Sequence, residues 1–230
     1  MSSNALKSVD ARLRLRRSMS LSSLVREAIE EMIVVGELKA GDRINESTLA
    51  QRLGVSRGPI REACRGLEEA GFLEVVLNHG TYVREIGLDE ARDLYEVRAA
   101  LAGYAGRLLP ARITARQLDE LEGLVKRMEK FAKGNDLDAY YPINLKFHEK
   151  LLEWSGNPKL KEFYESTVNQ LHLFRRRGLI QEGSLRASNN EHRAILEALR
   201  AGDPELAADT MQSHVANAFE RLRAAVEQAS

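Results

Sequence analysis

The stretch LAQRLGVSRGPIREA, residues 49–63, constrains the fold most, because one helix ends and another begins within it. Gly54 stands where the end of a helix favours a left-handed residue. Ser56 is a good N-cap residue, since its hydroxyl can accept a hydrogen bond from a first-turn amide. Pro59 is tolerated because its missing N–H has no partner in the first turn of a helix. A helix over residues 46–53, a glycine-containing turn and a second helix predict a helix-turn-helix.

The second helix of this motif, Ser56 to about Ala70, is predicted to have an apolar face and a basic face. Ile60, Cys64 and Leu67 follow the i, i+4, i+7 spacing and share the apolar face. Two of its arginines, Arg57 and Arg61, lie one turn apart on the other face. The pattern indicates a helix whose N-terminus is presented to an anion.

The segments that flank this motif complete a winged helix. An amphipathic helix is predicted over Leu21–Val35, and two β-prone runs, Phe72–Val76 and Tyr82–Glu85, surround LNHGT and predict a hairpin. A helix-turn-helix followed by a hairpin is typical of DNA-binding proteins, so DNA is the anion that this half is expected to bind. Arg57 and Arg61 have the planar fork that pairs with guanine O6 and N7.

The charge of the chain is balanced overall but not locally, since 34 Lys and Arg match 34 Asp and Glu in 230 residues. Residues 47–66 contain four arginines and one acid, and residues 12–17 contain four arginines and no acid. Such local basic clusters are typical of nucleic-acid contacts on a neutral protein. Arginines that only solvate a surface helix are the alternative interpretation.

The cysteine count and the N-terminus indicate the compartment. Cys64 is the single cysteine, which excludes an intramolecular disulfide and fits a reducing cytoplasm. The N-terminus lacks the apolar core of a signal peptide, and no apolar run approaches the length of a membrane span. We therefore expect a cytoplasmic protein without membrane contact, whose polar residues 1–20 form a flexible arm.

The remainder of the chain predicts an all-α bundle. The fold class is therefore mainly α, with a winged helix-turn-helix domain at residues 21–86 and a helical domain at residues 87–230. Six helices are predicted there: 89–109, 115–134, 137–154 with an interruption at Pro142, 159–177, one that starts after Ser188 and ends at Gly202, and one from Pro204 to the C-terminus. Thr114 with Gln117 is expected to form a capping box, and Asp203 is expected to cap the last helix.

Three histidines of the predicted bundle can converge. Asn144 and His148 are four residues apart, so they face the same way on one helix. His192 and His214 lie on two helices that a tight link, Gly202-Asp203-Pro204, joins. Three imidazoles and an amide oxygen suit a borderline divalent metal ion, zinc first, or nickel or manganese. Histidines scattered through a helical domain without a ligand are the alternative.

Residues 24–83 resemble the N-terminal domain of the GntR transcription regulators, through REAIEEMIVVGELKAGDRINESTLAQRLGVSRGPIREACRGLEEAGFLE and HGTYV. The resemblance implies that this half binds operator DNA. The DNA contacts that it implies are Ser47, Ser56, Arg57, Gly58, Arg61, His79 and Gly80. Gly58 replaces the threonine that the family usually has before the proline. Ser47 is a weaker contact than the arginine that some members carry.

Residues 89 to about 223 resemble the FCD ligand-binding domain of the FadR subfamily, through YEVRAAL, NLKFHEKLLEWSGNPKL and NNEHRAILEALRAGDPELAADTMQSHV. In that family an Asp-x-x-x-His pair and two later histidines hold a metal beside a carboxylate effector. The resemblance implies Asn144, His148, His192 and His214 as metal ligands and Arg98 as the partner of the effector carboxylate. Asn144 replaces the usual aspartate and brings no charge, so lower metal affinity or altered ion selectivity is expected. A surface ion pair is the alternative role of Arg98.

These features together predict a homodimeric transcription regulator that grips a palindromic operator and senses a small organic acid at the metal. Repression relieved by the acid is the favoured polarity, and no enzymatic activity is expected. Three alternatives remain open. In the first, the histidines hold a catalytic metal, although Glu191 is expected to point elsewhere and supplies no general base. In the second, the metal is purely structural. In the third, no metal binds, and Arg98 with neutral histidines binds the acid directly.

Overall fold

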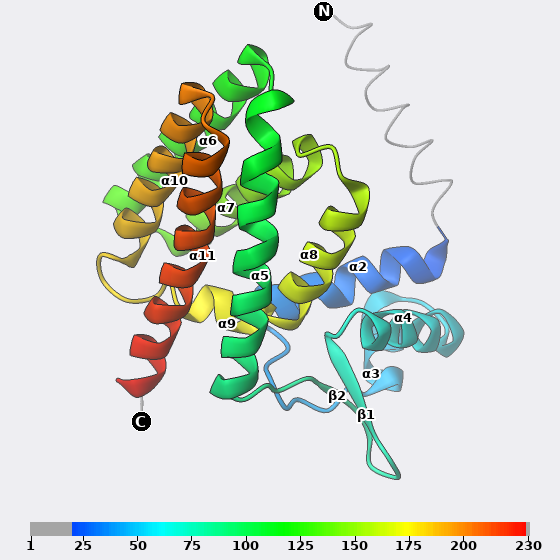
Figure 1. The fold of residues 1–230 in the computed structure, drawn as a ribbon. Helices are drawn as coiled ribbons and strands as arrows, with labels where there is room; N and C mark the ends of the chain where they lie inside the picture. The colour runs from blue at the N-terminus through cyan, green and yellow to red at the C-terminus, as the bar shows by residue number, and fades with distance from the viewer. Residues whose placement is uncertain (1–19, 229–230) are drawn as a thin grey trace, which may run out of the picture. The chain divides into compact units, whose positions relative to one another are not determined.

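The computed structural model describes residues 20–228, except the side chains of residues 172 and 173. The chain forms two compact units that divide between Glu85 and Ile86. Helices dominate both units (Figure 1). The flexible arm that the sequence predicts for residues 1–20 lies outside the described residues, apart from Ser20.

The first unit is a winged helix-turn-helix. Its elements are α2 (Leu21–Val34), α3 (Glu46–Leu53), α4 (Arg57–Glu69), β1 (Leu73–Val76) and β2 (Gly80–Val83). The two strands pair antiparallel, with Leu73 opposite Val83, and Arg43 adds an isolated bridge to Tyr82. All three helices and the hairpin contribute to one core, whose most buried side chains include Ile29, Ile33, Ile60, Leu67, Leu73 and Val83. The hairpin is therefore anchored to the helices at its base and free at its tip.

Local signals fix the start and the end of α3 and the helix that follows it. The side chain of Asn45 caps α3, because its oxygen accepts hydrogen bonds from the amides of Ser47 and Thr48 at 3.0 Å each. Gly54 ends α3 with φ 66°, a left-handed conformation that a side chain disfavours. The predicted apolar face of α4 is buried as expected at Ile60, Cys64 and Leu67. The predicted helix-turn-helix is confirmed.

The second unit contains only helices among its described residues. They are α5 (Leu88–Leu108), a 3-10 turn η1 (Leu109–Ala111), α6 (Ala115–Lys133), α7 (Leu137–Trp154), α8 (Pro158–Gln170), α9 (His172–Arg177), α10 (Ser184–Ala201) and α11 (Pro204–Glu227). The two long helices α5 and α11 run side by side, and α10 packs between α6 and α11 (Figure 1). None of the described helices combines the length with the apolar character that crossing a membrane requires.

The predicted helix starts are confirmed at α6 and α11. Thr114 and Gln117 form both bonds of the capping box. The carboxylate of Asp203 accepts hydrogen bonds from the amides of Glu205 and Leu206 at 3.0 Å each. Both caps depend only on neighbouring residues, which is why the sequence alone predicts them.

Three predicted helix boundaries in this unit are wrong. The segment predicted as one helix over 159–177 is two helices, since Leu171 leaves the α conformation with ψ 0°. The helix predicted to start after Ser188 begins at Ser184 instead. It follows directly on Gly183, whose φ of 81° is not helical. Pro142 does not interrupt α7. The backbone carbonyl that loses its partner there belongs to Asp138, which is exposed and can bond to water.

Gly106 allows α5 and α11 to approach closely, and its replacement is a test of this packing. A Cβ at Gly106 would lie 2.5 Å from the carbonyl oxygen of Ala207, which is backbone and cannot rotate away. We expect Gly106→Ala to lower the free energy of unfolding by about 3 kcal/mol, measured by urea unfolding followed by circular dichroism. Gly123→Ala in α6 is the matched control. No described atom lies within 4 Å of its new Cβ, so it should stabilise the protein by about 0.5–1 kcal/mol. Equal stability of the two variants would contradict the close approach.

Candidate functional site

Three of the residues that the sequence predicts to touch DNA lie around one hollow in the first unit. Ser47 at the start of α3, Arg57 at the start of α4 and Gly80 at the start of β2 line a cavity of about 470 Å³. The four other predicted contacts, Ser56, Gly58, Arg61 and His79, are exposed. The fold therefore brings the beginnings of both helices and the wing to one surface.

Glu46 of α3 connects the two arginines of this surface, a contact that the sequence analysis missed. Its Oε2 lies 2.8 Å from Nε of Arg61 and 3.5 Å from Nη2 of Arg57. The arginine side chains remain 57% and 58% exposed, so these ion pairs contribute at most about 1 kcal/mol to stability. Glu46 does hold both guanidinium groups on the same side of α4. The spacing of the arginines predicted their common face, but no sequence signal indicated that Glu46 on another helix is their partner.

The N-terminus of α4 is open to a ligand. Ser56 has the extended backbone of an N-cap residue, with φ −75° and ψ 166°. Within the described part of the chain its hydroxyl forms no capping hydrogen bond, contrary to the predicted cap. The first-turn amides therefore lack a side-chain acceptor, and a phosphate oxygen can take that place. At Gly58 an added Cβ would meet no described atom within 4 Å, so the packing of this unit does not require glycine there.

The wing brings a further arginine to the same hollow. Arg43 also lines it, and a Cβ added at Gly80 would lie 3.2 Å from Nε of Arg43. Gly80 has φ 114°, a conformation that side chains rarely adopt. Tyr82 donates a hydrogen bond to the backbone carbonyl of His79 at 3.3 Å, which ties the wing tip to β2. No sequence signal pointed to Arg43, because only the isolated bridge between Arg43 and Tyr82 places it beside the wing.

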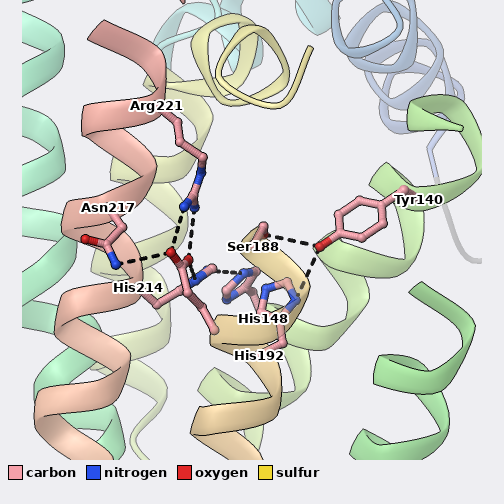
Figure 2. Close-up of polar contacts among 8 residues, drawn as sticks. Tyr140, His148, Ser188, His192, His214, Asn217 and Arg221 are labelled. Atoms are coloured by element: carbon pink, nitrogen blue, oxygen red, sulfur yellow. Dashed lines mark hydrogen bonds and ion pairs between the residues drawn. The ribbon is translucent and has the colours of Figure 1, made fainter. Parts of the chain in front are cut away.

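In the second unit, the three predicted histidines converge (Figure 2). His148 of α7, His192 of α10 and His214 of α11 each offer one ring nitrogen, and these atoms lie within 4.8 Å of one another. The Nε2 atoms of His148 and His214 are 3.2 Å apart. Nitrogens bound to one tetrahedral zinc ion at about 2.0–2.1 Å are roughly 3.3 Å apart. The cluster is therefore close to the dimensions of a metal site.

Burial keeps these histidines neutral, the form that binds a metal. It lowers the pKa of His148 and of His192 well below the usual value, and the neighbouring His214 lowers both further. Burial also lowers the pKa of His214, although a hydrogen bond with Glu191 offsets part of that effect. All three imidazoles are consequently uncharged at neutral pH.

Glu191 orients His214, which corrects the prediction that Glu191 points elsewhere. Its Oε2 lies 2.7 Å from Nδ1 of His214. Arg221 donates to both carboxylate oxygens at 2.7 and 3.0 Å, and Asn217 donates at 3.1 Å (Figure 2). Burial alone would raise the pKa of Glu191, but the hydrogen bonds from His214 and Arg221 lower it to about 2. The ionised carboxylate therefore accepts the Nδ1 proton of His214 and leaves the lone pair of Nε2 facing the cluster.

Tyr140 orients His192 in a similar way. The Tyr140 hydroxyl donates to Oγ of Ser188 at 3.2 Å, and its oxygen lies 3.4 Å from Nδ1 of His192 (Figure 2). With its own proton directed at Ser188, the hydroxyl oxygen can accept the Nδ1 proton of His192. Nε2 of His192 is then a free acceptor, and it is buried without a hydrogen-bond partner among the described residues.

Asn144 adds an oxygen to this set. Its side chain is buried one turn before His148 on α7, and its Oδ1 has no hydrogen-bond partner in the described part of the chain. Buried polar atoms without partners are costly, and two of them, Oδ1 of Asn144 and Nε2 of His192, belong to residues that can ligate an ion. Three neutral imidazoles and one amide oxygen therefore fit a divalent metal ion such as zinc.

Arg98 of α5 lines the same cavity as Asn144, His148 and His214. It is only 2% exposed, so the alternative of a surface ion pair is wrong. Its Nε donates to the hydroxyl of Tyr164 at 3.1 Å, while its Nη1 is buried without a partner among the described residues. An unsatisfied guanidinium nitrogen in this cavity suits a carboxylate ligand.

Family comparison decides what kind of protein carries these two sites. Residues 21–83 match the family described as "Bacterial regulatory proteins, gntR family", and residues 93–217 match the "FCD domain". The chain belongs to the GntR family of transcriptional regulators and carries an FCD domain. The predicted family and fold class of this GntR-family regulator are confirmed.

Individual relatives of the GntR-family regulator agree with this assignment. It is 30% identical over 201 residues to the "Uncharacterized HTH-type transcriptional regulator YdhC" of Bacillus subtilis (strain 168), covering 87% of this chain and 90% of that protein. It is 32% identical over 200 residues to the "Probable D-xylose utilization operon transcriptional repressor" of Paenarthrobacter nicotinovorans, covering 86% of each. These relatives are transcriptional regulators and not enzymes, which argues against the catalytic-metal alternative.

A solved structure supports the fold of both units. The structure of E. coli McbR/YncC matches with a TM-score of 0.79 and 23% identity, covering 92% of this chain and 100% of that chain. A GntR regulator from Rhodococcus sp. RHA1 matches with a TM-score of 0.73 and 21% identity, covering 90% and 99%. The regulator therefore shares its architecture with both.

Proposed function

We propose that this GntR-family regulator is a repressor that binds a palindromic operator as a homodimer and releases it when a small organic acid binds in the second unit. It acts in the cytoplasm on double-stranded DNA. One observation carries the acid-sensing part of this proposal: two histidines of the cluster, His148 and His214, line one cavity together with the unsatisfied Arg98. One relative, the "Probable D-xylose utilization operon transcriptional repressor", supports repression as the polarity.

The DNA-binding part of the proposal assigns separate roles to the surface of the first unit. The open N-terminus of α4 takes a backbone phosphate, with Ser56 and Gly58 beside it. Arg57 and Arg61 exchange Glu46 for base edges in the major groove. The remaining contacts come from α3 and from the wing, at Ser47, His79 and Gly80. In a homodimer two copies of this surface bind two half-sites, which is why a palindromic operator is proposed.

In the second unit the chain holds the ion and the acid in one place. His148, His192 and His214 would hold the ion with Asn144 as a fourth ligand, zinc first, or nickel or manganese. The bound ion would supply a positive centre for the acid's carboxylate. Glu191 and Tyr140 keep protons on the outer nitrogens of two histidines, and Arg98 donates to the carboxylate.

The same ligand set suggests how acid binding could change the affinity for the operator. The ligands come from α7, α10 and α11, so occupation of the cavity joins three helices of the bundle. The acid acts only if its affinity differs between the DNA-bound and the released arrangement of the dimer. Allosteric coupling between two sites is typically about 1–3 kcal/mol, which corresponds here to roughly 5–150-fold in operator affinity.

A thermal-shift screen of organic acids tests this function. We expect at least one acid to raise the unfolding midpoint of the zinc-loaded protein, because a ligand that binds only the folded state stabilises it. The same acid should weaken operator binding. If no acid shifts the midpoint of the zinc-loaded protein, the metal is structural and acid sensing is wrong. A shift that is unchanged after chelation would show that Arg98 and the histidines bind the acid without a metal.

A further inference from the structure

A second arginine, Arg175 of α9, is buried at the cavity that two histidines of the cluster line. It is 7% exposed and lines this cavity together with Arg98, His148 and His214. In the part of the chain that the structure describes, neither Arg98 nor Arg175 forms an ion pair with a carboxylate. Two buried guanidinium groups without acidic partners are unusual, since buried charges are normally paired.

The surroundings of these arginines are aromatic and neutral. The guanidinium carbon of Arg98 lies 5.4 Å from the ring centroid of Tyr95 and 5.5 Å from that of Tyr164. Burial lowers the pKa of Arg175, and the positive charge of Arg98 lowers it further. The two guanidinium groups therefore repel each other across a site that supplies rings and hydroxyls but no counter-charge.

The charges around the cavity leave a surplus of two positive charges. The charge of Glu191 is already matched by Arg221, which binds both of its oxygens. Neither the histidines nor Asn144 can bring a negative charge to the cavity. A divalent ion held by these ligands would add two further positive charges. A ligand with one carboxylate would leave at least one buried guanidinium unpaired.

The size of the cavity restricts the ligand further. The cavity measures about 20 Å³, which is roughly the space for one water molecule and not for an acid. A ligand can enter only if the surrounding side chains move outward, and each additional carbon requires more movement. Short ligands are therefore favoured over long ones.

We propose that the effector is a short dicarboxylate, of which one carboxylate is held by Arg98 beside the histidine cluster and the other by Arg175. This inference rests on the acid-sensing function proposed above and specifies the class of acid. Arg175 is the residue that distinguishes a dicarboxylate from a monocarboxylate, because Arg98 and the histidines suffice for a single carboxylate. Paired guanidinium–carboxylate hydrogen bonds supply both charge and geometry for this choice.

Calorimetric titration of the full-length, zinc-loaded protein with matched acids tests the proposal. The probes are malonate against propionate and succinate against butyrate, which match in carbon number and differ in charge. We expect at least one dicarboxylate to bind about tenfold or more tightly than its matched monocarboxylate. The same preference should persist in metal-free protein, because it comes from the arginines and not from chelation of the ion.

Substitutions separate the roles of the two arginines. Arg175→Met should lower dicarboxylate affinity about tenfold or more and leave monocarboxylate affinity within about twofold. Arg98→Met should weaken both classes of acid. Arg175→Gln keeps a hydrogen-bond donor without the charge and should behave like the methionine variant, so the test survives if one of the two variants fails to fold. Arg176→Met is the control on the same helix, because Arg176 pairs with Asp138 and does not line the cavity.

The outcomes distinguish this inference from the function on which it rests. Equal affinity for matched dicarboxylates and monocarboxylates would overturn the two-carboxylate effector and leave acid sensing intact. Failure of every acid to bind would overturn both. Inorganic phosphate is titrated as a dianion with a single centre, and tighter binding of phosphate than of either dicarboxylate would also overturn the inference.

Discussion

Arg61→Ala is expected to abolish specific operator recognition while the protein remains folded. One bidentate arginine–guanine pair contributes about 1–3 kcal/mol, so two copies in a homodimer should cost roughly 2–6 kcal/mol of operator affinity. The side chain is exposed and its only described ion pair is with Glu46, so little stability should be lost. Footprinting on DNA that flanks the regulator's own gene supplies the operator, and fluorescence anisotropy measures affinity for it.

Two controls separate base recognition from general charge. Arg200→Ala removes a comparably exposed arginine that pairs with Glu122 in the second unit, and its operator affinity should equal that of the unchanged protein. Arg61→Lys keeps the charge but loses the planar fork, so it should retain binding to random duplex and lose preference for the operator. An Arg61→Ala protein that binds the operator as tightly as the Arg200→Ala protein would refute the assignment of α4 as the recognition helix.

Glu46 adds a consequence to this expectation. The Glu46 carboxylate already pairs with Arg61 at 2.8 Å. Replacing this partner by a guanine would therefore contribute only the difference in free energy between the two pairs. On random DNA without a correctly placed guanine, the arginine can remain with Glu46. We therefore expect the pair to favour specificity over raw affinity, since only a matching base would compensate for the broken contact.

Sequence analysis could predict the features of the first unit that depend on neighbouring residues. The Gly54 turn, the Pro59 position and the apolar face of α4 are all set within one or two turns of helix. Glu46 and Arg43 were missed, because helix packing brings Arg61 to Glu46 and an isolated bridge brings Tyr82 to Arg43. The capping bond predicted for Ser56 is not formed, although the residue has the backbone of a cap.

In the second unit too, contacts that depend on the packing of distant helices could not be predicted, and some of them lie at the site. The family resemblance predicted His148, His192 and His214, whose ring nitrogens the structure brings together. Their roles as ligands remain a prediction. Glu191 was misjudged, because its position on α10 does not show that α11 packs against it. No sequence signal distinguished Arg175 from its two arginine neighbours, since only burial separates a cavity-lining arginine from a surface one.

Removal of one histidine of the cluster is expected to abolish metal binding. His192→Ala should reduce bound zinc from about one ion per chain to almost none, because it removes one of the three imidazoles that would hold the ion. The unchanged protein should gain about 2.7 kcal/mol of stability when free zinc is 100 times the dissociation constant, and the variant should gain almost nothing. Zinc content is measured by elemental analysis, and stability by thermal unfolding with and without chelator.

Measuring the stability of both proteins in chelator separates the loss of metal binding from the loss of packing that the substitution causes. His192 is fully buried, so the alanine variant should be less stable than the unchanged protein even without metal, and only the response to zinc reports ligation. His79→Ala on the exposed wing is the matched histidine control and should leave zinc binding unchanged.

Asn144→Asp completes the series, since a carboxylate at this position adds a negative charge and should tighten zinc binding. Unchanged affinity in that variant would exclude residue 144 as a ligand, whereas retention of zinc by His192→Ala would exclude the cluster itself.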